Sequence, residues 1–251
     1  MARRIIEGLQ GLPPELLWPL LAVVCFGAVL VLHRVFGEVG LHAYVVVAIL
    51  AANVQVLKAV QFSVFPAPVA LGTVAFSSTY LATDVLAERY GARSARRAVT
   101  LGFAGYLVFT VLMVLTMGFA PLTAEQAGAD MAWAVANHEH IVALFTPAPA
   151  LFAAGMTSYL LSQLHDVWLF DRLKKAFRDR HLWLRNNAST ALSALIDNLV
   201  FSLLAWIVFA AEPLPLATVL VVYVVGTWWL RLLVALADTP VIYLARRWGP
   251  P

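Results

Sequence analysis

Three aspartates lie within or at the ends of long apolar stretches of the chain, where a charged side chain is costly. They are Asp84 in FSSTYLATDVL, Asp166 in SYLLSQLHDVWLF and Asp197 in TALSALIDNLVF. The stretches are long enough to cross a bilayer, and an ionisable group at that depth usually faces a bundle interior or a wet cavity. These carboxylates therefore indicate a ligand, ion or proton site.

Further polar residues share helix faces with these aspartates. Residues three or four positions apart lie on one face of a helix. Three such pairs are Asp84 with Glu88, Gln163 with Asp166, and Ser193 with Asp197. Asp197 also lies eight residues after Ser189, about 12 Å along its helix, well inside the bilayer. The predicted substrate-binding residues are Asn53, Lys58, Asp84, Gln163, Asp166, Asp197 and Arg231, with Glu88 at an inner gate or interface.

Each of these residues also has a purely structural interpretation. Glu88 and Asp166 lie near a helix end, where hydration or pairing with the following arginine-rich loop competes with ligand contact. Asp197 and Arg231 could form a buried structural ion pair. Amides such as Asn53 could hold helices together by hydrogen bonds, as is common in membrane proteins.

The composition predicts an integral membrane protein with an all-α fold. Hydrophobic residues make up 62% of the 251 residues and charged residues only 12%, well outside the range of soluble domains. Lys and Arg cluster at the ends of apolar segments, so the net charge of +3 does not indicate a nucleic-acid partner. Residues 1–251 are expected to form a single membrane domain.

Seven apolar segments have a length that suits a membrane-spanning helix. They cover residues 16–36, 41–61, 67–87, 98–119, 147–170, 189–211 and 215–245. The segment between 120 and 146 is the longest hydrophilic connection and is expected outside the cell, with His138, Glu139 and His140 in a solvated loop.

Basic residues in short loops set the predicted orientation, because such loops stay in the cytoplasm. ERYGARSARR (88–97), DRLKKAFRDRHLWLR (171–185) and the C-terminal Arg246 and Arg247 are therefore expected inside. A spanning first helix would leave Arg3 and Arg4 outside, against this rule, so an interfacial or re-entrant placement of that helix remains open.

Several chemistries have no motif in the chain. It contains no G-x-x-x-x-G-K-[ST] loop for ATP phosphates and no H-E-x-x-H or Cys/His cluster for a metal. Ser162, His165 and Asp166 are too close on one helix to form a catalytic triad. The sequence therefore predicts neither an enzyme nor a bound cofactor or metal.

Four motifs in order resemble the queuosine-precursor transporters, also called the vitamin uptake transporter family. The resemblance covers about residues 48–245. The motifs are AANVQVLKAV (51–60), YLATDVLAERYGARSARR (80–97), SQLHDVWLFDRLKK (162–175) and LWLRNNASTALSALIDNLVF (182–201). This chain departs from the family with Ser162, Ala194 and Ala235, with Asp238 one turn later, and with Arg231 where Lys is usual.

The resemblance implies import of a 7-deazaguanine queuosine precursor across the cytoplasmic (inner) membrane. The candidates are 7-cyano-7-deazaguanine, 7-aminomethyl-7-deazaguanine and queuine. It also implies a six-helix core, about residues 41–245, similar to the substrate-binding subunits of energy-coupling-factor importers, with one extra N-terminal helix at 16–36.

Energy source and assembly remain open at this point. The alternatives are an ion-coupled carrier, or a substrate-binding subunit of an ATPase module, for another small vitamin-like solute. A solitary carrier is preferred over an ATPase partner, and a homo-oligomer is not excluded. Copurification of ATPase subunits in mild detergent would favour the module.

Overall fold

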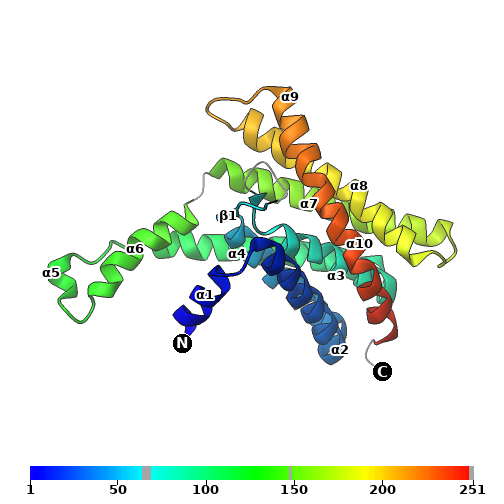
Figure 1. The fold of residues 1–251 in the computed structure, drawn as a ribbon, viewed down its shortest axis with the longest axis horizontal. Helices are drawn as coiled ribbons and strands as arrows, with labels where there is room; N and C mark the ends of the chain where they lie inside the picture. Colours follow the sequence, from blue (N-terminus) through cyan, green and yellow to red (C-terminus); the bar gives the residue numbers. More distant parts are fainter. Residues whose placement is uncertain (64–68, 147–148, 249–251) are drawn as a thin grey trace.

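The computed structural model describes residues 1–63, 69–146 and 149–248 and is almost entirely helical (Figure 1). Two of the expected spans, 67–87 and 147–170, begin on residues outside these ranges. The principal helices are α2 (Pro14–Gln55), α3 (Thr73–Arg89), α4 (Ala92–Met117), α7 (Pro149–Ala176), α8 (Leu182–Leu203) and α10 (Gly226–Arg247). Short elements are α1 (Ala2–Gln10), β1 (Ala59–Val60), β2 (Val69–Ala70), α5 (Ala124–Ala127), α6 (Ala132–Phe145), η1 (Leu204–Val208), α9 (Leu216–Thr218) and η2 (Val219–Val225).

Helix α2 is a helical hairpin rather than one straight rod. A straight helix of 42 residues would be about 63 Å long, yet the Ser63 backbone N–H near its end donates to Glu15 Oε1 near its start at 2.5 Å. The chain reverses at Gly37, which has φ 58° and ψ −132°. The two halves correspond to the predicted segments 16–36 and 41–61.

The hairpin turn lies beside the turn between α3 and α4. His33 Nε2 is 3.2 Å from the Tyr90 hydroxyl, and His42 Nε2 is 3.2 Å from Ser94 Oγ. The reversal at Gly37 is therefore at the same end of the bundle as the basic residues that follow α3. This arrangement agrees with a first helix that runs the full length of the second, while its placement in the bilayer stays a prediction.

Gly37→Ala is expected to lower the stability of the protein by about 1–3 kcal/mol, because a side chain at this positive φ strains the backbone. The measurement is the apparent unfolding temperature in detergent. Gly27→Ala is the control, because a Cβ at Gly27 meets no atom within 4 Å and alanine suits a helix better than glycine. Equal unfolding temperatures for the two variants would contradict the role of Gly37.

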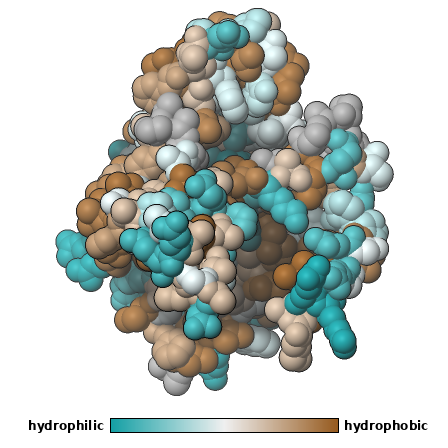
Figure 2. All heavy atoms as spheres, turned by 90° about the vertical axis from the view of Figure 1, so that its left-hand side faces the viewer, coloured by the Kyte–Doolittle hydropathy of each residue, from teal (hydrophilic) through white to brown (hydrophobic). Residues whose placement is uncertain are grey.

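The interior of the bundle contains a set of buried polar side chains beside its hydrophobic core, and much of its outer surface is apolar. Thr83, Asp84, Ser162, Gln163 and Asp166 are fully buried. Large apolar residues point outward instead, among them Val23, Val31, Val108, Leu115, Val221 and Leu236, and Figure 2 shows apolar areas interspersed with hydrophilic ones on one face. Such a distribution suits a protein whose surroundings are lipid and whose core holds the polar groups.

Four helical stretches are long and apolar enough to cross a membrane in the part of the chain that is described. They are Pro14–Gln55, Ala92–Met117, Leu182–Val208 and Leu216–Arg247. The predicted polytopic all-α membrane fold is therefore confirmed. The count of seven spans stays a prediction, because α3 and α7 carry the polar residues and fall outside this set of stretches.

Helices α3 and α7 occupy the middle of the bundle. Helix α3 packs against α2, α4, α7 and α10, and α7 packs against α3, α4 and α8. Helix α10 also packs against α8, so α3, α7, α8 and α10 together enclose one interior (Figure 1).

Two local expectations were wrong. The helix predicted over 41–61 ends at Gln55, and the chain then forms the two-stranded antiparallel pair β1 and β2. The connection at 120–146 contains helices α5 and α6, which extend from the bundle as an arm (Figure 1). His138, Glu139 and His140 therefore lie in α6 rather than in a loop.

Candidate functional site

The polar residues of the interior are ordered in layers along the four helices. Successive turns of α3 carry Tyr80, Asp84 and Glu88 on one face, all largely buried. The end of the bundle where α3, α7 and α10 finish and α8 begins carries the basic residues. From that end inward, the layers are an ion-pair layer, an acidic layer and a central charged pair.

The central pair joins α8 to α10. Arg231 Nη1 lies 2.6 Å from Asp197 Oδ2, with side-chain exposures of 15% and 4%. Ser162 on α7 donates its hydroxyl to Asp197 Oδ1 at 3.1 Å. The Arg231 guanidinium also lies over the Phe76 ring, 5.0 Å from its centroid. A charged pair therefore lies beside an aromatic ring inside the bundle.

Gln163 connects α7 to α3 next to this pair. Its Nε2 donates to Thr79 Oγ1 at 2.7 Å, and its Oε1 accepts from Thr83 Oγ1 at 3.4 Å. Both ends of the amide are thus engaged by α3 in this conformation. The contacts fit the interpretation of Gln163 as an interhelical link, and they also place a donor and an acceptor at the same depth as Ser162.

The acidic layer contains Asp84 from α3, Asp166 from α7 and Asp238 from α10, all at most 1% exposed. The three carboxyl groups interact electrostatically with one another. Asn186 on α8 donates its Nδ2 to Asp238 Oδ1 at 2.8 Å. Asp84 and Asp166 make no hydrogen bond through either oxygen within the described structure.

The ion-pair layer closes the basic end of the interior. Glu88 on α3 accepts from Arg185 Nη1 at 3.0 Å and from Arg185 Nη2 at 3.3 Å. Lys174 on α7 lies 3.3 Å from the same carboxylate, and Arg246 on α10 lies 3.6 Å from it. One glutamate therefore joins four helices at this end of the bundle.

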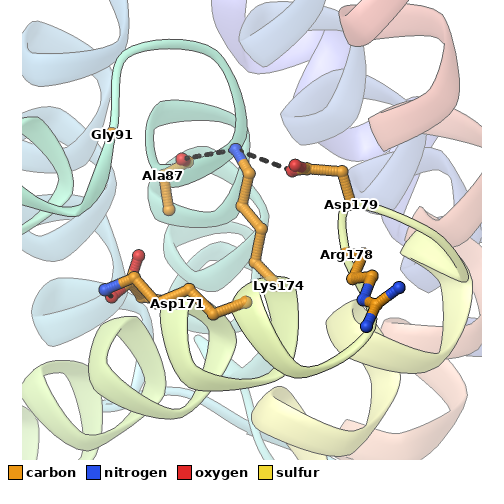
Figure 3. Close-up of a pocket in the computed structure, with 7 residues that line it drawn as sticks. Ala87, Gly91, Asp171, Lys174, Arg178 and Asp179 are labelled. Carbon is orange, nitrogen blue, oxygen red and sulfur yellow. Dashed lines mark hydrogen bonds and ion pairs between the residues drawn. The ribbon is translucent and has the colours of Figure 1, made fainter.

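A surface cavity of about 300 Å³ opens just outside the ion-pair layer, lined in part by Ala87, Lys174 and Asp179. Figure 3 shows Lys174 reaching toward the Ala87 carbonyl, 3.5 Å away, and the Asp179 carboxylate, 3.8 Å away. Neither Glu88 nor any aspartate of the acidic layer is among the residues that line this cavity.

Six of the eight predicted residues lie together in this interior: Asp84, Glu88, Gln163, Asp166, Asp197 and Arg231. Their roles in binding stay predictions.

Asn53 and Lys58 lie elsewhere. Asn53 donates to the Ile49 carbonyl at 2.9 Å and lines a separate, mostly apolar cavity of about 550 Å³ beside Tyr106, Phe145 and Phe152. Lys58 is exposed in the turn before β1, because α2 ends at Gln55 and no longer places it on a helix face.

Three interior residues were missed as site residues. Arg185 was assigned to a cytoplasmic loop, but α8 begins at Leu182 and buries it completely. Asn186 shares the helix face of Ser189, Ser193 and Asp197, so its register in LWLRNNAST could have revealed it. Asp238 was noticed only as a departure from the family pattern, and no local signal shows that it meets Asp84.

Comparison with known proteins agrees with the motifs. The family model described as "Putative vitamin uptake transporter" matches residues 70–245. A protein of Bacillus subtilis (strain 168) named "Probable queuosine precursor transporter" is 31% identical over 235 residues, covering 93% of this chain and 95% of that protein. No solved structure matches the chain. The predicted family is confirmed, and the chain belongs to the vitamin uptake transporter family.

Proposed function

We propose that this chain imports a 7-deazaguanine queuosine precursor across the cytoplasmic membrane. The observation that carries the proposal is the Asp197–Arg231 pair, which lies inside the bundle beside Ser162, Gln163 and Phe76. The name of the Bacillus subtilis relative supports the substrate class. The comparisons and the membrane fold agree with a transporter rather than an enzyme.

The chemistry of the substrate matches these side chains. A guanine-like edge has adjacent N–H donors, which one carboxylate such as Asp197 can accept in pairs. Its ring carbonyl can accept from the Arg231 guanidinium or the Gln163 amide. Its flat face can stack on Phe76, which now faces the guanidinium. Substrate binding would then replace the Asp197–Arg231 contact with two contacts to the ligand.

The closed interior suits alternating access. The site residues are buried in the present conformation, so a substrate enters only when the helices separate on one side. The ion-pair layer around Glu88 would open toward the basic end, while rearrangement on the far side would admit substrate from outside. Because Arg89 also donates to the Arg246 carbonyl at 2.9 Å, the ends of α3 and α10 are expected to move together.

The orientation we propose places the basic end and the C-terminus in the cytoplasm. Arg89, Lys174, Arg185 and Arg246 all gather around Glu88 or beside it. Basic residues at one end of a bundle are typical of the cytoplasmic side. Labelling of a single cysteine introduced after Arg247, in a variant without Cys25, would test this side directly.

The function is tested by the queuosine content of tRNA in bacteria that lack both queuosine-precursor synthesis and their own importer. Cells expressing this chain are expected to restore queuosine when low concentrations of one of the three candidate bases are supplied. Supplying the bases singly identifies which is carried. Membrane-inserted protein that restores no queuosine with any of them would overturn the proposal.

A further inference from the structure

In the part of the chain that the structure describes, no positively charged side chain forms an ion pair with the acidic layer. Among the described residues, Asp84, Asp166 and Asp238 make no ion pair, whereas Glu88 is paired with Arg185, and Asp197 with Arg231. Arg185 is the cation that acts electrostatically on Asp84, but its guanidinium is bound to Glu88. Within the described ranges, the interior therefore holds three carboxyl groups that form no ion pair.

The carboxyl groups of this layer also receive few hydrogen bonds. Both oxygens of Asp84, both oxygens of Asp166 and Asn186 Oδ1 are buried and have no hydrogen-bond partner within the described structure. Ser189 and Ser193 face Asp166, but their hydroxyls are engaged with the Asn186 carbonyl at 3.2 Å and with His165 Nδ1 at 2.9 Å. A cluster of acceptors without donors is costly in a low-dielectric interior.

Protonation of these carboxyl groups accounts for both the missing ion pairs and the missing hydrogen bonds. A protonated carboxyl carries no charge and supplies an O–H donor to a neighbouring acceptor. Three carboxylates that interact with one another cannot all be ionised when they are dehydrated and unpaired. The described residues also contain no group of three or more His, Cys, Asp or Glu side chains that could hold a metal ion, which favours a proton over a metal cation.

We propose that the acidic layer, Asp84, Asp166 and Asp238, is a proton-binding site whose protons enter the cell together with the substrate. When the interior opens outward, a carboxylate of the layer takes one proton from outside water and forms one O–H bond on one of its two oxygens. The proton leaves to water when the interior opens inward through the ion-pair layer. No oxidant or reductant is involved, and the carboxylates return to their starting state after each cycle.

The other ionisable groups around this layer are already engaged or belong to neighbouring layers. They are Tyr44 on α2, Tyr80 and Glu88 on α3, His165 and Lys174 on α7, Arg185 and Asp197 on α8, and Arg231 on α10. Helix α4 meets α3 and α7 through small or apolar residues such as Ala98 and Val99. The proton site is thus assigned to the three aspartates rather than to His165, which is bound to Ser193.

The first test measures the proton site without any substrate. Purified protein at neutral pH is expected to show the infrared band of protonated carboxylic acid, and Asp238→Asn is expected to weaken or shift it. Asp238→Asn keeps an oxygen that can accept from Asn186. Asp179→Asn is the matched control, because Asp179 is exposed on the surface, and it should leave the band unchanged. Absence of the band in the wild-type protein would overturn the proton site.

The second test measures coupling and rests on the proposed transport function. In proteoliposomes, an inward proton gradient of one pH unit is expected to support up to about tenfold accumulation of a 7-deazaguanine for each proton carried. Asp238→Asn should reduce this response to that seen without a gradient. Accumulation driven by a sodium gradient alone, or equal uptake with and without the proton gradient, would overturn coupling. No uptake under any gradient, with the infrared band present, would overturn the transport function and leave the proton site standing.

Discussion

Asp197→Asn is expected to reduce uptake of the substrate by about 100-fold or more. Truncating one member of a buried, hydrogen-bonded charge pair costs about 2–5 kcal/mol, and Asp197 is held by both Arg231 and Ser162. Asparagine has the same shape and can still accept from Ser162, but it presents one oxygen and no charge to the N–H groups of the base. Uptake of labelled base at equal membrane expression is the measurement.

A double variant separates substrate binding from a purely structural ion pair. Asp197→Asn alone leaves the Arg231 charge buried, whereas Asp197→Asn with Arg231→Gln removes both charges. We expect the double variant to recover thermal stability but not uptake. Asp130→Asn, at an exposed position in the arm that contains α5 and α6, is the control for the loss of a negative charge. Normal uptake by the Asp197→Asn variant would contradict a role of Asp197 in substrate binding. Recovery of uptake in the double variant would favour a purely structural ion pair.

Arg185→Met is expected to cause the largest loss of stability of any single ion-pair variant, about 3–5 kcal/mol. It removes the buried partner of Glu88 and leaves an incompletely compensated charge. It also removes the guanidinium that lies 5.2 Å from the centroid of the Phe170 ring. The measurement is the midpoint of denaturant-induced unfolding in detergent.

Arg246→Met is the matched control for this variant. Arg246 approaches the same Glu88 carboxylate at 3.6 Å, but its side chain is 47% exposed whereas that of Arg185 is 0% exposed. Solvent screening limits such exposed pairs to about 0–1 kcal/mol. Equal losses in the two variants would show that burial does not decide the strength of the ion-pair layer. Glu88→Gln combined with Arg185→Met should recover part of the loss.

The sequence was sufficient to predict most of the interior, because helical periodicity places polar residues on one face. Asp84 and Glu88 are four apart, as are Ser193 and Asp197, and both pairs point into the bundle. The position of the turn in the α2 hairpin also agrees with the sequence, because Gly37 lies between the predicted segments 16–36 and 41–61. In a long apolar helix whose polar residues recur at helical spacing, those residues share one face, and that face is expected to point into the bundle.

Other features depend on the tertiary structure. Glu88 and Arg185 are 97 residues apart in the chain, so their pairing does not follow from local sequence. Asp238 joins the acidic layer only because α10 crosses α3. Lys58 was assigned to the interior on the assumption that its helix continues, whereas α2 ends three residues earlier.

One missed element did carry a local signal. Thr123 and Gln126 form a capping box, in which each side chain accepts a hydrogen bond from the backbone N–H of the other residue. The spacing T-x-x-Q is typical of a helix start, so the first helix of the arm, α5, could have been expected from the sequence.

The most direct test of the transport function is uptake of a radiolabelled 7-deazaguanine by cells that lack both its synthesis and its import. Cells expressing this chain are predicted to accumulate the label, and an excess of unlabelled 7-deazaguanine should block accumulation while unrelated nucleobases and vitamins do not. Asp197→Asn cells should remain at the level of cells without the protein. Membrane-inserted wild-type protein that gives no accumulation above that level, or competition by every base alike, would contradict the account.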